Sequence, residues 1–275
     1  MAEGSALKAM VSFFTVWQQE ITQEDMDAME RKFHLAPVVG ALLGLAVLIV
    51  SAVLVWVDSE SIFGSSMFTA IAVLATVFVG SRFLHFDGLA DFGDGSVVAG
   101  TQEDHVRALK DTLIGAGALG VALTVTLFNF AEYTMAGYLL VIAAPCTEVL
   151  VKNAQVAAAA FGIPGHGMAG RQVSETGIRS AEVSSVISLI LVLVFAVVGT
   201  VVLDDLIFGF DIVFLEDAIF AVVFALIASV VAGYLMARRS NRVFGMVNGD
   251  ILGATNEISR AVIMAVFVLF YAMVV

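Results

Sequence analysis

Long apolar stretches alternate with short polar stretches along most of the chain. A helix needs about 20 mostly apolar residues to cross the roughly 30 Å hydrocarbon core of a bilayer. The pattern predicts seven such helices, at residues 36–57, 66–85, 113–131, 133–151, 184–203, 213–236 and 257–275. A count of six or of eight spans is also open, because several boundaries are uncertain by a few residues and residues 133–161 also fit one long helix that continues beyond the bilayer. We therefore expect an all-α, polytopic transmembrane bundle of about seven spans.

The composition supports a membrane protein and sets the N-terminal segment apart. Of the 275 residues, 60% are hydrophobic and 14% are charged, whereas soluble domains contain about 45 to 50% apolar residues. Residues 1–35 are polar and acidic, and they lack the apolar core of a signal peptide. We expect residues 1–35 to form an amphipathic cytosolic segment and residues 36–275 to form one integral membrane domain.

The basic residues predict the orientation, because Lys and Arg accumulate in cytoplasmic loops. All 13 basic residues lie near alternate ends of the predicted spans, and they are Lys8, Arg31, Lys32, Arg82, Arg107, Lys110, Lys152, Arg171, Arg179, Arg238, Arg239, Arg242 and Arg260. The intervening loops carry acidic residues instead. This distribution predicts a cytosolic N terminus in the cell membrane. The net charge of -12 argues against nucleic-acid binding.

Three aspartates gather in the segment His85-Phe-Asp-Gly-Leu-Ala-Asp-Phe-Gly-Asp-Gly95, at the cytosolic end of the second predicted span. Spacings of four and three residues place Asp87, Asp91 and Asp94 on one face of a helix. These like charges repel one another without a cation, and their hard oxygen atoms suit Mg²⁺ or Mn²⁺ beside substrate phosphates. Gly88 would let a phosphate approach the backbone closely. The alternative is a solvated acidic loop that caps a helix.

A second acidic segment, Asn248-Gly-Asp-Ile-Leu-Gly-Ala-Thr-Asn-Glu257, lies at the cytosolic entry to the last predicted span. Its polar residues Asp250, Asn256 and Glu257 are flanked by apolar sequence. Polar side chains at membrane depth are costly and usually face a bundle interior or a cavity. Glu257 could instead form a helical ion pair with Arg260, which would leave Asp250 unexplained.

The remaining charged candidates each have a functional and a structural interpretation. Lys110 could neutralise phosphate charge beside Asp111, or it could anchor a span at the cytosolic surface. His85 could orient a carboxylate, contact phosphate or simply pack. Glu148 and Lys152 have the spacing of a helical ion pair, and we interpret them as a structural pair within the fourth predicted span.

Three segments, in order, resemble the cobalamin synthase family. The segment from His85 to Gly95 is similar to its H-x-D-G-L-A-D-x-x-D-G signature, and Lys110-Asp111 with Ile114-Gly115 resembles its K-D-x-x-[IV]-G segment. The segment from Asn248 to Glu257 resembles its G-D-x-L-G-A-x-N-E segment. The family commonly has Ser-Arg after Lys-Asp, where this chain has Thr112-Leu113. The matches extend over about 170 residues, and the multispan architecture agrees over the whole chain.

The resemblance implies an enzyme that joins adenosylcobinamide-GDP to α-ribazole or its 5′-phosphate and releases GMP, with Mg²⁺ as cofactor and Mn²⁺ as an alternative. The residues expected to act in catalysis are Asp87, Asp91, Asp94, Lys110 and Asp111, and those expected to bind substrate are His85, Gly88, Asp250, Asn256 and Glu257. The expected metal ligands are Asp87, Asp91, Asp94 and Asp250, and either Asp111 or His85 could be the base.

Two rival functions remain open from the sequence. A CDP-alcohol phosphotransferase also uses an aspartate-rich motif with a metal, but it expects Arg where Asp91 follows Ala90. A cation-coupled transporter would place its carboxylates near the bilayer midplane, whereas these lie at one predicted edge. The sequence leaves homo-oligomerisation open.

Overall fold

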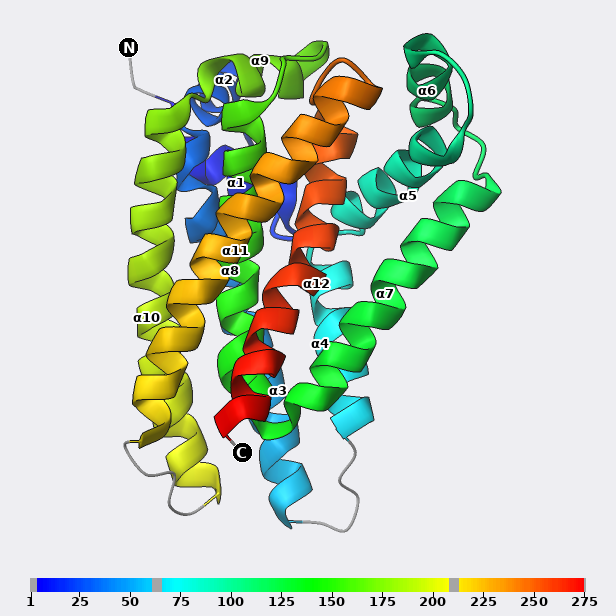
Figure 1. The fold of residues 1–275 in the computed structure, drawn as a ribbon. Coiled ribbons are helices and arrows are strands. Elements are labelled where there is room, and N and C mark those ends of the chain that lie inside the picture. Colours follow the sequence, from blue (N-terminus) through cyan, green and yellow to red (C-terminus); the bar gives the residue numbers. More distant parts are fainter. Residues whose placement is uncertain (1–3, 61–65, 208–212, 275) are drawn as a thin grey trace.

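The computed structural model describes residues 4–60, 66–207 and 213–274, and these residues form a helical bundle (Figure 1). Its long helices are α3 (Ala36–Glu60), α4 (Ser66–Gly80), α7 (Ala116–Ala136), α8 (Leu140–Phe161), α10 (Ile178–Ile207), α11 (Val213–Val243) and α12 (Gly249–Val274). Shorter helices lie at one end of the bundle, and they are α1 (Ala6–Phe14), α2 (Gln23–Arg31), α5 (Leu84–Val97), α6 (Gln102–Leu109) and α9 (Gly167–Glu175). The predicted all-α fold is confirmed.

Helix α8 is the centre of the bundle. Every residue from Leu140 to Ala159 is buried, and α3, α10, α11 and α12 all pack against this helix. A helix that is apolar all round must be buried or surrounded by lipid. The outward faces of α3, α7 and α10 instead expose large apolar side chains, such as Ile49, Leu127 and Ile190. These helices are those of an integral membrane protein.

The predicted number of seven spans is not confirmed. By length and hydropathy, five stretches of the described residues could cross a membrane, or six if α4 and α5 form one broken span bent by 91°. Helix α4 has only 15 residues, about 22 Å at 1.5 Å per residue, which is shorter than the hydrocarbon core. Helices α7 and α8 belong to one apolar stretch of 46 residues, although the chain reverses direction between them (Figure 1).

The N-terminal segment packs against the bundle. Helix α2 begins with a capping box between Thr22 and Asp25, and Asp25 also accepts a hydrogen bond from the Ser5 backbone at 2.6 Å. These backbone N–H donors, first that of Thr22 and then that of Ser5, lower the pKa of Asp25 to about 2. Glu30 forms a bidentate ion pair with Arg171 on α9. Residues 6–31 therefore form part of the structure around the site described below.

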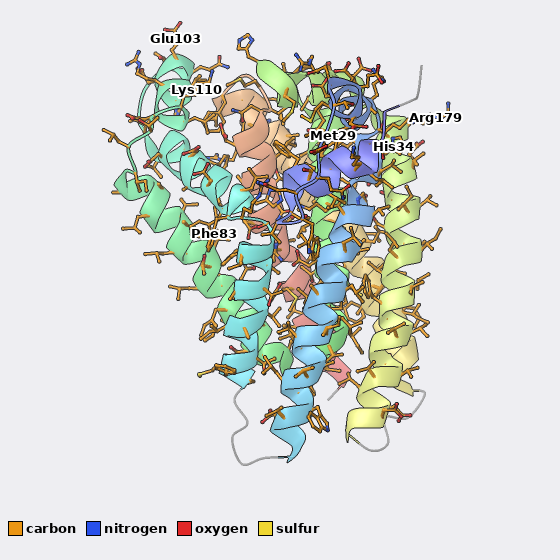
Figure 2. All side chains as sticks on the ribbon, turned by 180° about the vertical axis from the view of Figure 1, so that it is seen from behind. Met29, His34, Phe83, Glu103, Lys110 and Arg179 are labelled. Atoms are coloured by element: carbon orange, nitrogen blue, oxygen red, sulfur yellow. The ribbon has the colours of Figure 1, made fainter. Side chains whose placement is uncertain are left out.

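One end of the molecule carries the labelled basic side chains Lys110 and Arg179, together with α2, α6 and α9 (Figure 2). Phe83 lies lower, at the corner where α4 meets α5. The end of α12 lies at the opposite end of the bundle from α1 and α2 (Figure 1). The cytosolic location of the basic end stays a prediction, because it depends on the sequence rule alone.

Candidate active site

Two of the three sequence motifs meet where α5 crosses α12. A Cβ atom on Gly88 would lie 2.6 Å from the backbone oxygen of Asp250 and 3.1 Å from the Cα of Gly253. A Cβ atom on Gly253 would in turn lie 3.3 Å from the Cα of Gly88. Only glycine permits such a close approach of two helix backbones. The crossing therefore brings the segments around residues 88 and 250 together, although they are far apart in the sequence.

A sharp corner between α4 and α5 sets the direction in which α5 runs to this crossing. Arg82 and Phe83 have φ angles of 54° and 55°, a left-handed conformation that costs about 1 to 3 kcal/mol for each non-glycine residue. The Arg82 guanidinium donates hydrogen bonds to the backbone oxygens of Ser12 and Phe13, at 3.2 and 2.8 Å. The end of α1 is thus fixed to the corner, and these bonds help to hold its backbone conformation.

The acid cluster consists of Asp87, Asp91 and Asp250. Asp87 is exposed, whereas Asp91 and Asp250 are half-buried. The charges of Asp250, Asp87 and Asp94 all act on Asp91, and that of Asp87 acts on Asp250. Among the described residues, the carboxylates of Asp87 and Asp91 make no hydrogen bond or ion pair, and Asp250 accepts one bond, from the Asn248 amide at 2.8 Å. The cluster therefore concentrates negative charge without a neutralising partner in direct contact.

Asp94, which the sequence assigns to the same cluster, holds the start of α7. Its two carboxylate oxygens accept hydrogen bonds from the backbone N–H groups of Gly115 and Ala118, at 2.7 and 2.8 Å. Free N–H groups at a helix start favour a negatively charged acceptor. A Cβ atom on Gly115 would lie 2.4 Å from the Asp94 carboxylate, which explains the glycine there. Asp94 differs in this from Asp87 and Asp91, although the sequence assigns all three the same role.

The acid cluster has the ligand chemistry of a Mg²⁺ site. Within the described part of the chain, no three His, Cys, Asp or Glu side chains form a ready-made set of metal ligands. Mg²⁺ commonly retains several waters and binds through one or two carboxylates together with substrate phosphates. The acid cluster therefore fits a metal that is completed by substrate, and it does not resemble an all-protein cage.

One hollow is lined by residues of the acid cluster, and a second is lined by Lys110, whose charge acts on Asp250. The inner hollow has a volume of about 200 Å³, and its lining includes Phe13, Phe14, Phe33, His85, Asp87 and Asp250. The outer groove has a volume of about 740 Å³ and lies between α6, the loop after α8 and the loop before α12. A bridge between Pro164 and Val247 joins those two loops. Two aspartates of the acid cluster thus line the inner hollow, whereas none of them lines the outer groove.

Lys110 and Asp111 line the outer groove rather than the inner hollow. Lys110 ends α6 and is exposed, and its charge acts favourably on Asp250. Asp111 is exposed, and its carboxylate accepts a hydrogen bond from the Leu113 backbone at 3.1 Å. Arg107 and His166 line the same groove. The groove therefore offers cationic side chains at the edge of the acid cluster.

His85 and Asn256 belong to a chain of buried polar contacts below the inner hollow. His85 is 3% exposed, and its Nε2 atom lies 2.5 Å from the Lys152 ammonium. Lys152 also donates a hydrogen bond to Asn256 at 2.9 Å, and it lies 5.1 Å from the centre of the Phe14 ring. His85 reaches the hollow, whereas Asn256 does not line it. Asn256 thus holds Lys152, although the sequence assigns it to substrate binding.

Glu257, a predicted substrate-binding residue, forms a buried ion pair with Arg260 at 3.2 Å. The structural alternative for Glu257 is therefore confirmed. Arg260 is fully buried, and it also pairs with Glu148 and donates a hydrogen bond to the Tyr133 hydroxyl at 3.4 Å. The predicted Glu148–Lys152 pair is wrong, because Arg260 reaches Glu148 from α12 while Lys152 turns toward His85.

Sequence patterns missed several residues at the inner hollow. Phe13 and Phe14 come from the N-terminal segment, whose packing against the corner has no sequence signal that we identify. Gln155 lies in the apolar run of α8, and Gln172 lies on α9. A buried amide within an apolar helix is costly unless it is paired. The position of Gln155 in an apolar run was therefore the sequence signal that could have identified it as a candidate site residue.

Comparisons with known proteins identify the family. A family model described as Cobalamin-5-phosphate synthase matches residues 6–268. An adenosylcobinamide-GDP ribazoletransferase of Methanocella arvoryzae is 30% identical over 93% of this chain and 92% of its own length. The enzyme of that name from Prosthecochloris aestuarii is 29% identical over 90% of this chain and 92% of its own length. No solved structure matches the chain significantly. The match over nearly the whole length shows that this chain belongs to the cobalamin-5-phosphate synthase family.

Proposed function

We propose that this protein is an adenosylcobinamide-GDP ribazoletransferase that acts at the crossing of α5 and α12. The observation that carries the proposal is the acid cluster, in which Asp87, Asp91 and Asp250 lie together at the edge of the bundle and Asp87 and Asp250 line a hollow. Membership of the family and the names of the relatives agree with this chemistry. They do not favour a CDP-alcohol phosphotransferase or a transporter.

The proposed reaction breaks a phosphoanhydride bond and forms a phosphate ester bond. A ribose hydroxyl oxygen of α-ribazole forms a bond to the phosphorus that carries cobinamide, and the bond from that phosphorus to the bridging oxygen breaks. The bridging oxygen and its electron pair leave with GMP, while the hydroxyl proton passes to a basic group of the site. His85 and Asp87 line the inner hollow and are in place to orient the hydroxyl. Lys110 is in place to neutralise the diphosphate, because it lines the outer groove near Asp250.

Mg²⁺ would be held by one or two of the carboxylates of Asp87, Asp91 and Asp250 together with the substrate diphosphate, and when bound it would neutralise negative charge on that diphosphate. The choice of these three follows from their free oxygens, since both Asp94 oxygens are used by α7. The proposal predicts that chelation of divalent ions abolishes turnover and that added Mg²⁺ restores it, with Mn²⁺ as the second ion to test.

The decisive experiment uses the purified full chain in detergent with adenosylcobinamide-GDP, α-ribazole 5′-phosphate and Mg²⁺. GMP and the joined corrinoid product are expected in equal amounts, and Asp87→Asn should abolish both. Asp204→Asn is a matched control, because Asp204 is exposed in α10, far in sequence from all three motifs. Absence of GMP release, together with activity on a CDP-activated lipid, would contradict the proposal.

We also propose that the active site faces the cytosol in the cell membrane. The arrangement of Lys110 and Arg179 at one end agrees with the rule that basic residues stay on the cytoplasmic side (Figure 2). The single native cysteine, Cys146, is buried, so introduced cysteines can be labelled selectively. A membrane-impermeant maleimide applied to intact cells should label Tyr138→Cys and spare Glu103→Cys. The reverse result would invert the orientation.

A further inference from the structure

The inner hollow is lined by apolar, mostly aromatic side chains and by polar side chains. The apolar lining includes Phe13 and Phe14 of α1, Phe33 and Met168, and the polar lining includes His85 and Asp87. A cavity of about 150 Å³ with apolar walls is large enough to bind benzene, so a hollow of about 200 Å³ has room for a somewhat larger aromatic ring system.

Two buried polar atoms in this lining have no partner among the described residues. They are the side-chain amide nitrogen of Gln172 and the side-chain oxygen of Gln155. Gln172 is 4% exposed and Gln155 is 1% exposed. The Gln155 amide nitrogen donates to the Leu252 backbone oxygen at 2.9 Å, which fixes the direction of the side chain. An unpaired buried donor or acceptor is unfavourable, so the pair indicates a ligand that accepts from Gln172 and donates to Gln155.

α-Ribazole has the chemistry that these walls require. Its base is 5,6-dimethylbenzimidazole, an apolar bicyclic ring with one free ring nitrogen that accepts a hydrogen bond and no N–H group. Its ribose carries hydroxyl donors. Guanine, in contrast, has three N–H donors that an aromatic wall would leave unpaired. The corrin ring is far larger than the hollow.

Resting on the proposed function, we propose that the inner hollow is the site of the α-ribazole nucleoside. The base packs between Phe14 and Met168, its ring nitrogen accepts a hydrogen bond from Gln172, and a ribose hydroxyl donates to Gln155. The other end of the ribose then faces Asp87 and Asp250. The nucleotide-activated corrinoid approaches from the outer groove, where Lys110 and Arg107 meet its phosphates.

Binding of α-ribazole alone to the purified full chain tests this assignment without turnover. Isothermal titration should show that Gln172→Leu weakens binding by about tenfold, the effect of one lost hydrogen bond. Ala169→Phe, which fills the hollow from α9, should weaken it at least as much. Both variants should affect α-ribazole and its 5′-phosphate equally, and the KM for adenosylcobinamide-GDP should stay within about twofold. Gln23→Leu, an exposed Gln on α2, is the matched control and should change neither.

The possible failures are distinguishable. If the wild type binds α-ribazole and forms product while both variants bind it normally, the base lies elsewhere and the assignment is wrong. A rise in the KM for adenosylcobinamide-GDP alone would place the nucleotide in the inner hollow and also overturn it. If the wild type neither binds α-ribazole nor releases GMP, the proposed function itself fails, and the assignment fails with it.

Discussion

The acid cluster and the ion network inside the bundle differ in whether their charged side chains are paired. The ion network comprises Glu148, Lys152, Asn256, Glu257 and Arg260, all of which are at most 1% exposed and bonded to one another or to His85 and Tyr133. The acid cluster of Asp87, Asp91 and Asp250 is more accessible, and it has no cation in direct contact among the described residues.

This contrast separates structural charge from functional charge. A buried charge that is fully paired is tolerated in a bundle, and the loss of one partner is expensive because the other charge stays buried. Like charges that remain unpaired beside a hollow destabilise the empty protein, and they are useful only when a cation or substrate neutralises them. Substitutions in the two regions should therefore change stability and activity in different proportions.

The largest effect is expected for Arg260→Met. This change leaves Glu148 and Glu257 buried without their cation, which should lower the free energy of unfolding by about 3 to 5 kcal/mol. The yield of folded protein in detergent and its thermal unfolding provide the measurement. Arg238→Met is the matched control, since Arg238 is exposed on α11. Equal melting temperatures for the two variants would contradict a structural role for the ion network.

In the acid cluster, Asp91→Asn should lower the rate of GMP release by about 100-fold to 1,000-fold. The melting temperature should stay the same or rise, because the substitution removes repulsion from Asp87 and Asp250. Activity and thermal unfolding are measured on the same preparation. A variant that is both inactive and strongly destabilised would place Asp91 with the structural charges.

The crossing itself can be opened by Gly88→Ala. The added methyl would lie 2.6 Å from the Asp250 backbone oxygen, so α5 and α12 must separate, at a cost of about 1 to 3 kcal/mol and with loss of activity. Gly120→Ala on α7 is the control, because in the described part of the chain nothing besides the local helix backbone and the neighbouring residues lies within 4 Å of a Cβ placed there. It should stabilise the helix by about 0.5 to 1 kcal/mol. Full activity of Gly88→Ala would show that close contact is unnecessary.

Substitutions of Asp94 test whether its carboxylate has a structural or a functional role. Asp94→Ala should destabilise the protein by about 1 kcal/mol through loss of the α7 cap, while Asp94→Asn keeps one acceptor oxygen and should cost less. Asp94→Asn should also retain more activity than Asp91→Asn. GMP release and thermal unfolding are again the measurements. An equal loss of activity for Asp94→Asn and Asp91→Asn would indicate that Asp94 is a metal ligand, as the sequence predicts.

The smallest effect concerns the N-terminal segment at low pH. Because the pKa of Asp25 is lowered from 3.8 to about 2, its contribution to docking of α1 is complete above about pH 4 and is lost as the pH falls through about 2. Fluorescence of Trp17, in a Trp56→Phe background, should be constant down to about pH 4 and then change. Asp25→Asn should show the altered emission at every pH, and a transition near pH 6 would contradict this explanation.

The sequence alone determined the class of the fold and the general location of the chemistry. Apolar stretches of sufficient length require a membrane or a buried core, and this requirement is local. The clustering of Asp87 and Asp91 within one helical turn is local as well, and so is the pairing of Glu257 with Arg260 three residues later. These features could be predicted because each depends on residues that are neighbours along the chain.

Only the tertiary structure decided which charges are neutralised and which stay free. Arg260 pairs with Glu148 from another helix, Asp94 serves α7 rather than its own cluster, and Phe14 reaches the hollow from a segment that the sequence sets apart. A side chain's role depends on what lies within a few ångströms of it, and helix packing brings together residues that are more than a hundred positions apart.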